Sequence, residues 1–379
     1  MKTAQIKYEN NKWNLQQDSV CNFIADLAII FGSRKLFQNE NILKKIEGIG
    51  KGTIIAGCTT SGEITGTSVT EDTITVTLIK FEKTNIVQKF ERIGETSKSF
   101  ETGRKLMEQF DPKGLKHVLV LSDGLKVNGS KLVEGFREVF KKDVSITGGL
   151  AGDGTLFKET YVLNNSMKAV SGIVTAVGFY GENIRIGYGS LGGWDTFGIE
   201  RLITKSDDNV LYELDGVPAL ELYKSFLGEQ AQFLPAAGML FPLSVRTKAD
   251  SSPVVRTILG INEENQSLIF AGDMPQGSYA RLMKANVDRL IMGAEGAAKA
   301  GMKIFKDVSP KLAILISCVG RKLVLKQIVE EEIESVESVI GGNTAITGFY
   351  SYGEISPFIS DSACMLHNQT MTVTLINEN

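Results

Sequence analysis

The stretch GCTTSGEITG, residues 57–66, places a thiol, hydroxyls and a carboxylate between glycines, directly after an apolar run. Cys58 could act as a nucleophile and Glu63 as an acid–base group. Thr59 and Ser61 offer hydroxyls that could hydrogen-bond to a ligand. The stretch is therefore consistent with a catalytic elbow, a binding loop or a glycine-rich turn.

Nucleophilic catalysis by Cys58 would require a base and an oxyanion site. The two histidines of the chain are His117, at the start of an apolar strand, and His367, beside a predicted turn. The sequence TSGE around Ser61 lacks the GxSxG pattern of a nucleophile elbow, and no phosphate-binding GxxxxGK[ST] motif occurs. These observations favour a buried, unreactive Cys58, and they leave an enzyme that uses Cys58 or a carboxylate as an alternative.

A pattern of Ile-x-Gly followed by an acidic residue occurs three times, as IAGCTTSGE, ITGGLAGD and ITGFYSYGE. The copies end at Glu63, Asp153 and Glu354, and each follows an apolar strand. Ligands of open α/β sheets bind at the carboxyl ends of the strands. The three acids could therefore accept hydrogen bonds from an ammonium or hydroxyl group in one shared pocket. The alternative is that the glycines serve turns and the acids cap backbone amides.

Each copy lies within the same predicted order of strand, helix, strand, loop and strand. Strict alternation in TITVTLIKF predicts a strand that closes the first unit, and ACMLHNQTMTVTLIN predicts a hairpin around Asn368-Gln369. The predicted elements are strands 27–31, 53–57 and 73–81 with helix 37–46, strands 117–122, 145–149, 161–165 and 172–180 with helix 130–140, and strands 311–318 and 345–348 with helix 321–334.

Between the second and third copies, residues 185–285 are rich in β-forming residues and turn signals, and they predict a largely antiparallel insertion or second layer. Helices are expected at 218–226 and 287–306, the second with small residues suited to close packing. The fold class predicted is α/β, with repeated β-α-β-β units forming packed mixed sheets flanked by helices, and with a β-rich middle segment.

Further loops that follow predicted strands add candidates for ligand binding. SDG, which ends the strand at 117, offers a hydroxyl and a carboxylate. SLGGWD offers Trp194, which could form an aromatic wall of a binding site or could belong to the core. The candidate ligand-binding residues are Gly57, Cys58, Thr59, Ser61, Glu63, Ser122, Asp123, Gly149, Asp153, Trp194, Tyr350, Ser351 and Glu354.

The composition excludes several classes of function. A formal net charge of -3 and a pI near 5.7 do not suggest a nucleic-acid partner or an anionic membrane surface. The scattered cysteines lack the spacing of a disulfide framework or a zinc site, and no cofactor or metal is expected. The first residues lack a signal-peptide core, and no apolar run is long enough to span a membrane. These features predict a cytoplasmic protein.

Several motifs, taken in order, resemble the FIST family, whose name stands for F-box and intracellular signal transduction. GCTTSGEITG, ITGGLAGDG, LGGWDTFG and NVLYELDGVPALELY resemble its N-terminal half. AGDMPQGSYARL, AILISCVGRKLVL, IGGNTAITGFYSYGEISP and LHNQTMTVTLI resemble its C-terminal half. The resemblance implies an N-terminal extension at 1–25, a FIST N-terminal domain at 26–216 and a FIST C-terminal domain at 217–379.

The family resemblance implies a cytoplasmic sensory module that binds a small polar ligand, such as an amino acid or a related metabolite. The chain has no room for an added kinase, cyclase or F-box domain, so we expect a separate signalling partner. The alternatives are an enzyme acting on small polar metabolites and an interaction scaffold that has no small ligand. The family carries no established catalytic residues that can be placed on this sequence.

Overall fold

The computed structural model describes residues 1–15, 22–46, 49–140, 144–165, 167–247, 253–306, 308–358 and 362–379. Cys21 and part of the predicted extension at 1–25 lie outside these residues. No helix in the described ranges is long and apolar enough to cross a membrane.

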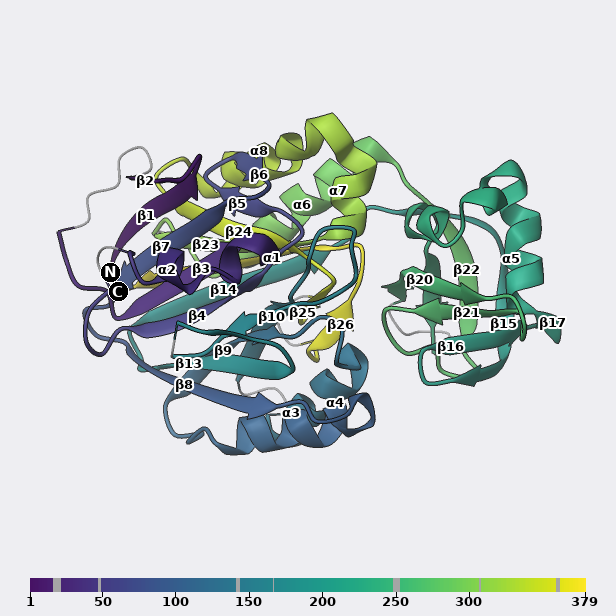
Figure 1. The fold of residues 1–379 in the computed structure, drawn as a ribbon, viewed down its shortest axis with the longest axis horizontal. Coiled ribbons are helices and arrows are strands. Elements are labelled where there is room, and N and C mark those ends of the chain that lie inside the picture. The colour runs from purple at the N-terminus through teal and green to yellow at the C-terminus, as the bar shows by residue number, and fades with distance from the viewer. Residues whose placement is uncertain are drawn as a thin grey trace.

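Three units of the same design form the larger body of the protein, on the left of Figure 1. In each unit two strands run parallel, and a third strand lies antiparallel to the first. This confirms the predicted α/β class with repeated units. The strands are β3 (Leu27–Gly32), β4 (Ile54–Thr59) and β7 (Ile74–Lys80) in unit one, β9 (Leu115–Ser122), β10 (Ser145–Leu150) and β13 (Ile173–Tyr180) in unit two, and β23 (Leu312–Cys318), β24 (Ala345–Ser351) and β27 (Met371–Glu378) in unit three.

A short strand leaves each unit after its glycine-rich loop and joins the sheet of another unit. β5 (Glu63–Thr65) of unit one pairs with β24 of unit three, and β25 (Gly353–Ser356) of unit three pairs with β10 of unit two. β11 (Val162–Leu163) of unit two pairs with β4 of unit one. The exchange forms a closed cycle, so it brings together the loops that precede these strands.

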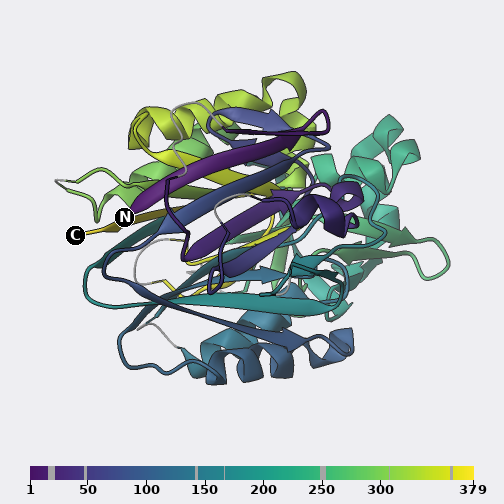
Figure 2. The same ribbon diagram turned by 60° about the vertical axis from the view of Figure 1, so that its left-hand side comes forward.

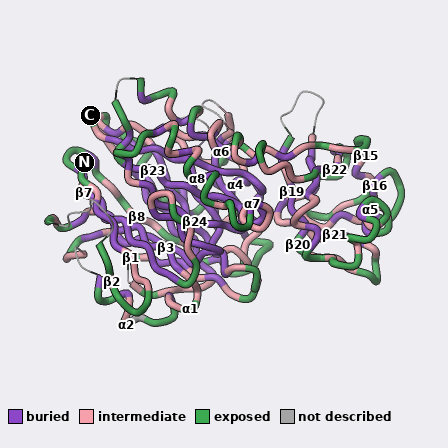
Figure 3. Tube along the Cα trace, turned by 90° about the horizontal axis from the view of Figure 1, so that it is seen from above, coloured by how far each residue is buried: buried purple, intermediate pink, exposed green. Residues whose placement is uncertain are grey.

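The sheets enclose a shared apolar core, which appears as buried strands in the centre of Figure 3. Phe31 of β3 and Phe349 of β24 meet there with ring centroids 4.6 Å apart. Leu121 of unit two and Ile316 of unit three belong to the same cluster. Because all three units contribute to one core, none of them can be removed without exposing the others.

Helices cover the outer faces of the body, as Figures 1 and 2 show. The predicted helix at 37–46 is instead two single turns, because the Asn39 side chain accepts a hydrogen bond from the Asn41 backbone N–H and starts a second turn. The helices are α1 (Arg34–Phe37), α2 (Glu40–Leu43), α3 (Ser99–Glu108), α4 (Gly129–Val139), α5 (Ala219–Leu227), α6 (Val287–Met302), α7 (Val319–Leu325) and α8 (Val329–Ile340).

The glycines and alanines of α6 allow it to lie directly on β14 (Ile184–Leu191), as its composition suggested. A Cβ atom on Gly187 would lie 2.0 Å from the carbonyl oxygen of Gly301, and one on Gly189 would lie 2.3 Å from that of Ala297. β14 pairs with β27 and extends the sheet of unit three. The first strand of the predicted β-rich segment therefore belongs to the main body.

The rest of that segment forms an antiparallel domain, on the right of Figure 1. An apolar cluster that includes Ile203, Tyr223 of α5 and Phe270 fills its interior. The prediction of a largely antiparallel insertion is confirmed. Its strands are β15 (Asp195–Asp207), β16 (Val210–Leu214), β17 (Val217–Pro218), β18 (Leu243–Arg246), β19 (Val254–Arg256), β20 (Ile258–Asn262), β21 (Ser267–Phe270) and β22 (Tyr279–Lys284).

Two details at the chain ends depart from the simple repeat. β1 (Lys2–Glu9) pairs with β7, so the first residues contribute a strand to the sheet of unit one. The predicted hairpin around Asn368-Gln369 is wrong, because β26 (Met365–His367) pairs with β25 while β27 pairs with β14 and β23. The remaining strands are β2 (Lys12–Leu15), β6 (Ser68–Thr70), β8 (Asn85–Arg92) and β12 (Ala169–Val170).

Candidate functional site

The three glycine-rich loops follow β4, β10 and β24, and they contact one another directly. The cyclic exchange of β5, β11 and β25 brings together the three loops through which the chain leaves each unit. Their backbones are joined by hydrogen bonds from Ser61 N–H to Tyr350 O at 2.8 Å, from Gly152 N–H to Thr59 O at 2.9 Å, and from Tyr352 N–H to Leu150 O at 3.2 Å.

Glu63 begins β5 and is only 1% exposed. Its Oε1 accepts a hydrogen bond from the Thr60 hydroxyl. Its Oε2 accepts from the Thr73 backbone N–H at 3.2 Å and from the Thr73 hydroxyl at 2.6 Å. Burial raises the pKa of Glu63 to about 7, although these hydrogen bonds and Lys322 act in the opposite direction. The carboxyl group can therefore exchange a proton near neutral pH.

Glu354 has the same surroundings in unit three and is fully buried. One oxygen accepts from the Ser351 hydroxyl at 2.6 Å, and the other accepts from the Thr370 N–H at 3.2 Å and the Thr370 hydroxyl at 3.0 Å. Burial raises the pKa of Glu354 to about 8, against these hydrogen bonds and the charge of Arg321. Glu354 therefore lies in the protein interior rather than at a surface of the loops.

Asp153 is held differently, because it lies one residue earlier in its loop than the two glutamates do. Its Oδ1 accepts from the Tyr352 hydroxyl, and its Oδ2 accepts from the backbone N–H groups of Lys158 and Glu159 at 3.1 Å each. Arg34 Nη1 lies 3.4 Å from the same Oδ2. Asp153 thus links the loops of units two and three to the first helix of unit one.

A pocket of about 500 Å³ opens beside the loops of units one and two. We call it the loop pocket, and it brings together three of the predicted residues, Ser61, Glu63 and Asp153. Its wall carries charges of both signs, because two cations of the first helical turn line it together with carboxylates of the loops, and Arg34 pairs with Asp153. The residues that define it here are Arg34, Lys35, Ser61, Glu63, Glu71, Asp72, Asp153 and Gly154.

Other predicted residues of the same loops lie in the packed interior. Cys58 is fully buried, and the Thr59 hydroxyl accepts from the Tyr161 N–H at 3.0 Å. A Cβ on Gly57 would lie 2.1 Å from the Ile30 carbonyl oxygen, so the parallel strands of unit one require glycine there. Tyr350 donates its hydroxyl to Glu332 at 2.6 Å, and Ser351 donates its hydroxyl to Glu354. Gly149 of β10 lies opposite Glu354 of β25 in the sheet.

The candidates outside these loops do not line the loop pocket. Ser122 donates its hydroxyl to the carbonyl of Asp123. The Asp123 carboxylate accepts from the backbone N–H groups of Leu125, Lys126 and Gly172, so it caps a turn. Trp194 is 7% exposed, packs with Met283, Leu290 and Leu325, and donates its indole N–H to Gln369 O at 3.2 Å.

The geometry around Cys58 does not support catalysis by its thiol. Burial raises the pKa of Cys58 well above its usual range. His117 contacts the hydroxyls of Ser145 and Thr147 at 2.7 and 3.0 Å, and His367 Nε2 lies 2.8 Å from the Ser356 carbonyl oxygen. Within the described ranges, no group of three histidine, cysteine, aspartate or glutamate residues could hold a metal ion.

The cations of the loop pocket were not predicted from the sequence. β3 ends at Gly32, and Arg34 and Lys35 follow Ser33 in the next turn, so the strand-end rule applied to the other loops would have found them. Lys322 of α7 does not line the pocket itself, but it donates to the Ser61 carbonyl oxygen at 2.6 Å, across 261 residues of sequence, and it pairs with Glu71. No local sequence pattern predicts these contacts.

Family comparison matches the chain to two domains of one family. The FIST N domain matches residues 26–217, and the FIST C domain matches residues 219–357. The chain belongs to the FIST family. Domains of this family are associated with signal transduction and small-ligand sensing. The FIST N match covers units one and two, while the FIST C match includes most of the antiparallel domain and the loop of unit three.

Comparison with other proteins adds little to the FIST assignment. No curated protein matches the sequence. Among solved structures, the crystal structure of the cyanuric acid hydrolase from A. caulinodans is similar at a TM-score of 0.35 and 8% identity, over 94% of this chain and 90% of that one. Similarity at this level carries no statement about activity.

Proposed function

We propose that this FIST protein binds a small polar ligand, an amino acid or a related metabolite, in the loop pocket, and that a separate partner protein receives the signal. The observation that carries the proposal is that Ser61, Glu63 and Asp153 share one pocket with Arg34 and Lys35. Groups of both signs around a cavity suit a molecule that has a carboxylate and an ammonium group.

Within the proposal, the two types of charged group take different parts of the ligand. Lys35, an exposed cation at the first turn after β3, and Arg34, which is 25% exposed at its side chain, face the ligand carboxylate. Asp72, in the turn before β7, faces its ammonium group together with Oε2 of Glu71, whose Oε1 accepts from Lys322. Glu63 and Asp153 have their oxygens bound by internal donors, so they fix the wall of the pocket.

We propose binding rather than turnover, because the Cys58 thiol is buried and its pKa is raised. The proposal includes a cytoplasmic location, which the free cysteines Cys58, Cys318 and Cys364 favour, since disulfides form in oxidising compartments.

The test is a thermal-shift screen against a panel of amino acids. A ligand present at about 100 times its Kd stabilises the native state by roughly 2.7 kcal/mol, which raises the melting temperature. Arg34→Ala should abolish the shift, while Glu354→Gln should retain it, because Glu354 does not line the loop pocket. A shift that Arg34→Ala and Lys35→Ala both leave unchanged would place the ligand elsewhere.

A further inference from the structure

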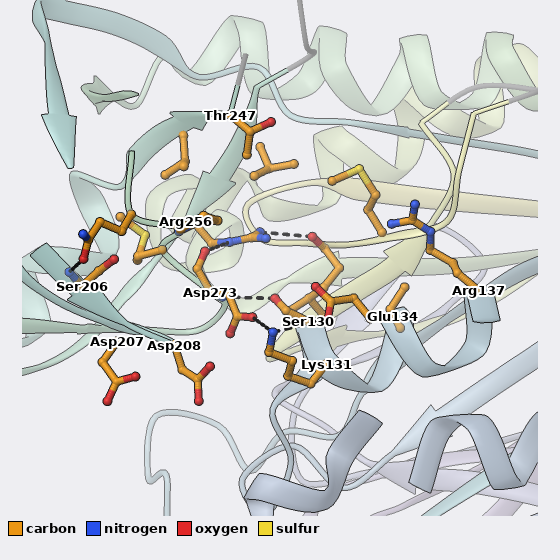
Figure 4. A pocket seen from close by; sticks show the side chains of 18 of the residues that line it. Ser130, Lys131, Glu134, Arg137, Ser206, Asp207, Asp208, Thr247, Arg256 and Asp273 are labelled. Atoms are coloured by element: carbon orange, nitrogen blue, oxygen red, sulfur yellow. Dashed lines mark hydrogen bonds and ion pairs between the residues drawn. The ribbon is translucent and has the colours of Figure 1, made fainter. Parts of the chain in front are cut away.

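A second pocket, of about 440 Å³, lies in the cleft between α4 of unit two and the antiparallel domain. Figure 4 shows it from close by. Lys131 and Arg137 of α4 line one wall, and Asp207, Asp208 and Arg256 of the antiparallel domain line the other. We call it the cleft pocket. None of its lining residues belongs to the glycine-rich loops of the predicted site.

A set of hydrogen bonds fixes the two walls of the cleft pocket relative to each other. Asp273 of the antiparallel domain accepts from Asn128 Nδ2 at 2.8 Å, and its backbone N–H donates to Ser130 Oγ at 3.1 Å. Lys131 Nζ lies 3.4 Å from the same carboxylate. Arg256 Nη1 donates to the Leu366 carbonyl oxygen at 3.1 Å. The pocket is therefore preformed rather than an open gap.

Arg256 carries a buried positive charge that no carboxylate neutralises directly. It is 5% exposed, and its three hydrogen bonds all go to carbonyl oxygens, those of Asp273, Val255 and Leu366. The N–H donors of its Nη2 atom have no partner within the described part of the chain, and no ion pair to Arg256 occurs there. Burial lowers the pKa of Arg256 to about 10, with Asp273 acting in the opposite direction. A buried charge of this kind is costly unless an anion pairs with it.

The acidic groups of the cleft pocket limit what that anion can be. Asp207 is the last residue of β15, and Asp208 begins the turn to β16. Both are exposed, and their carboxylates form no ion pair with any described residue. In Figure 4 they lie at the opposite end of the pocket from Arg137, and Asp273 lies between them and Arg256. With Glu134 and Asp273 the lining holds four carboxylates against three cations, so a polyanion such as a nucleotide would be repelled.

We propose that the cleft pocket is a second ligand site, which takes a small zwitterion whose two charges are separated, such as an ω-amino carboxylate or a short peptide. The ligand carboxylate pairs with the free Nη2 donors of Arg256. Its ammonium group lies against Asp207 and Asp208. Because the ligand occupies the space between α4 and the antiparallel domain, its binding stabilises the contact between the two bodies.

The test is isothermal titration calorimetry of the full chain with 5-aminopentanoate and glycylglycine, with pentanoate as the comparison. We expect at least one zwitterion to bind. We expect pentanoate, which lacks the ammonium group, to bind at least about tenfold more weakly, which corresponds to a loss of about 1.4 kcal/mol. Absence of measurable heat for both zwitterions at millimolar concentration would overturn the proposal.

Variants locate the site. Asp207→Asn with Asp208→Asn removes both acids from an exposed turn, and asparagine tolerates the left-handed backbone of Asp208, whose φ is 44°. We expect this pair to weaken zwitterion binding about tenfold or more, and Arg256→Lys to weaken it as well if the variant folds. Arg34→Ala should leave it unchanged, so failure of the loop pocket and failure of the cleft pocket are distinguishable. Binding that the aspartate pair does not alter would contradict the assignment.

Discussion

Glu63 and Glu354 occupy equivalent positions in units one and three and accept matching hydrogen bonds. Each accepts from a hydroxyl three residues earlier, Thr60 or Ser351, and from both donors of a threonine that precedes the closing strand. The repeat is therefore chemical as well as architectural. Glu63 lines the loop pocket and Glu354 does not, which makes Glu354 a matched control for every experiment on the pocket.

The two glutamates should make the stability of the protein fall as the pH rises. Burial raises their folded-state pKa values to about 7 and about 8, whereas an unfolded glutamate titrates near about 4.3. Folding takes up protons between these values, so the free energy of unfolding declines across that interval by up to about 1.4 kcal/mol per pH unit for each group. Burial lowers the pKa of His117 to about 3 and that of His367 to about 4, which gives the opposite slope below about pH 6.5.

The glutamate effect should thus appear alone between about pH 6.5 and 8. Urea unfolding across this range measures it. Glu354→Gln should flatten the decline above about pH 7, while Glu63→Gln should flatten only the part below. A wild-type stability that stays level or increases over this range would show that the carboxylates are ionised in the folded protein.

Three equivalent glycines let the parallel strands of each unit approach closely. We expect alanine at any of them to destabilise the protein by about 1–3 kcal/mol or more, because a Cβ would overlap the backbone of the neighbouring strand. Gly94→Ala is the control, since nothing lies within 4 Å of a Cβ there. An added Cβ would lie 2.1 Å from Ile30 O at Gly57, 1.9 Å from Val120 O at Gly148, and 2.0 Å from Leu315 O at Gly348. Chemical denaturation that ranks Gly94→Ala with these three would contradict the packing.

The Arg321–Glu332 ion pair should behave as a coupled unit. Both side chains are fully buried, with Arg321 Nη2 2.7 Å from Glu332 Oε2. Arg321→Met leaves a buried carboxylate without its partner and should cost about 3–5 kcal/mol. Adding Glu332→Leu should restore part of that loss, because the uncompensated charge is removed. Equilibrium unfolding of the single and double variants gives the coupling, and strictly additive losses would rule it out.

The parallel strands and the repeated order could be predicted from the sequence, because continuous apolar runs before Ile-x-Gly mark buried strands. The cyclic exchange could not, since β11 has only two residues and β5 three, too few for any periodicity. The pairing of each depends on a unit distant in sequence. The hairpin error has the same origin, because the pattern around Asn368 predicts local pairing and the competing partner is β25.

The candidate site was predicted in part. Ser61, Glu63 and Asp153 were found from the glycine-rich loops, and the loop pocket brings them together. Tyr352, which binds Asp153, lies 199 residues away in sequence, so its role depends on the assembled fold. The separation of Glu354 from the pocket likewise follows from burial that the loop sequence alone does not determine.

Hydrogen–deuterium exchange, measured with and without a mixture of free proteinogenic amino acids, tests the central claim most directly, because it locates a bound molecule whatever its identity. We predict slower exchange at residues 33–38, 60–63 and 153–156, which surround the loop pocket, and no change there in Arg34→Ala. Unchanged exchange across these segments, or protection confined to other parts of the chain, would contradict the proposal that the loop pocket binds the ligand.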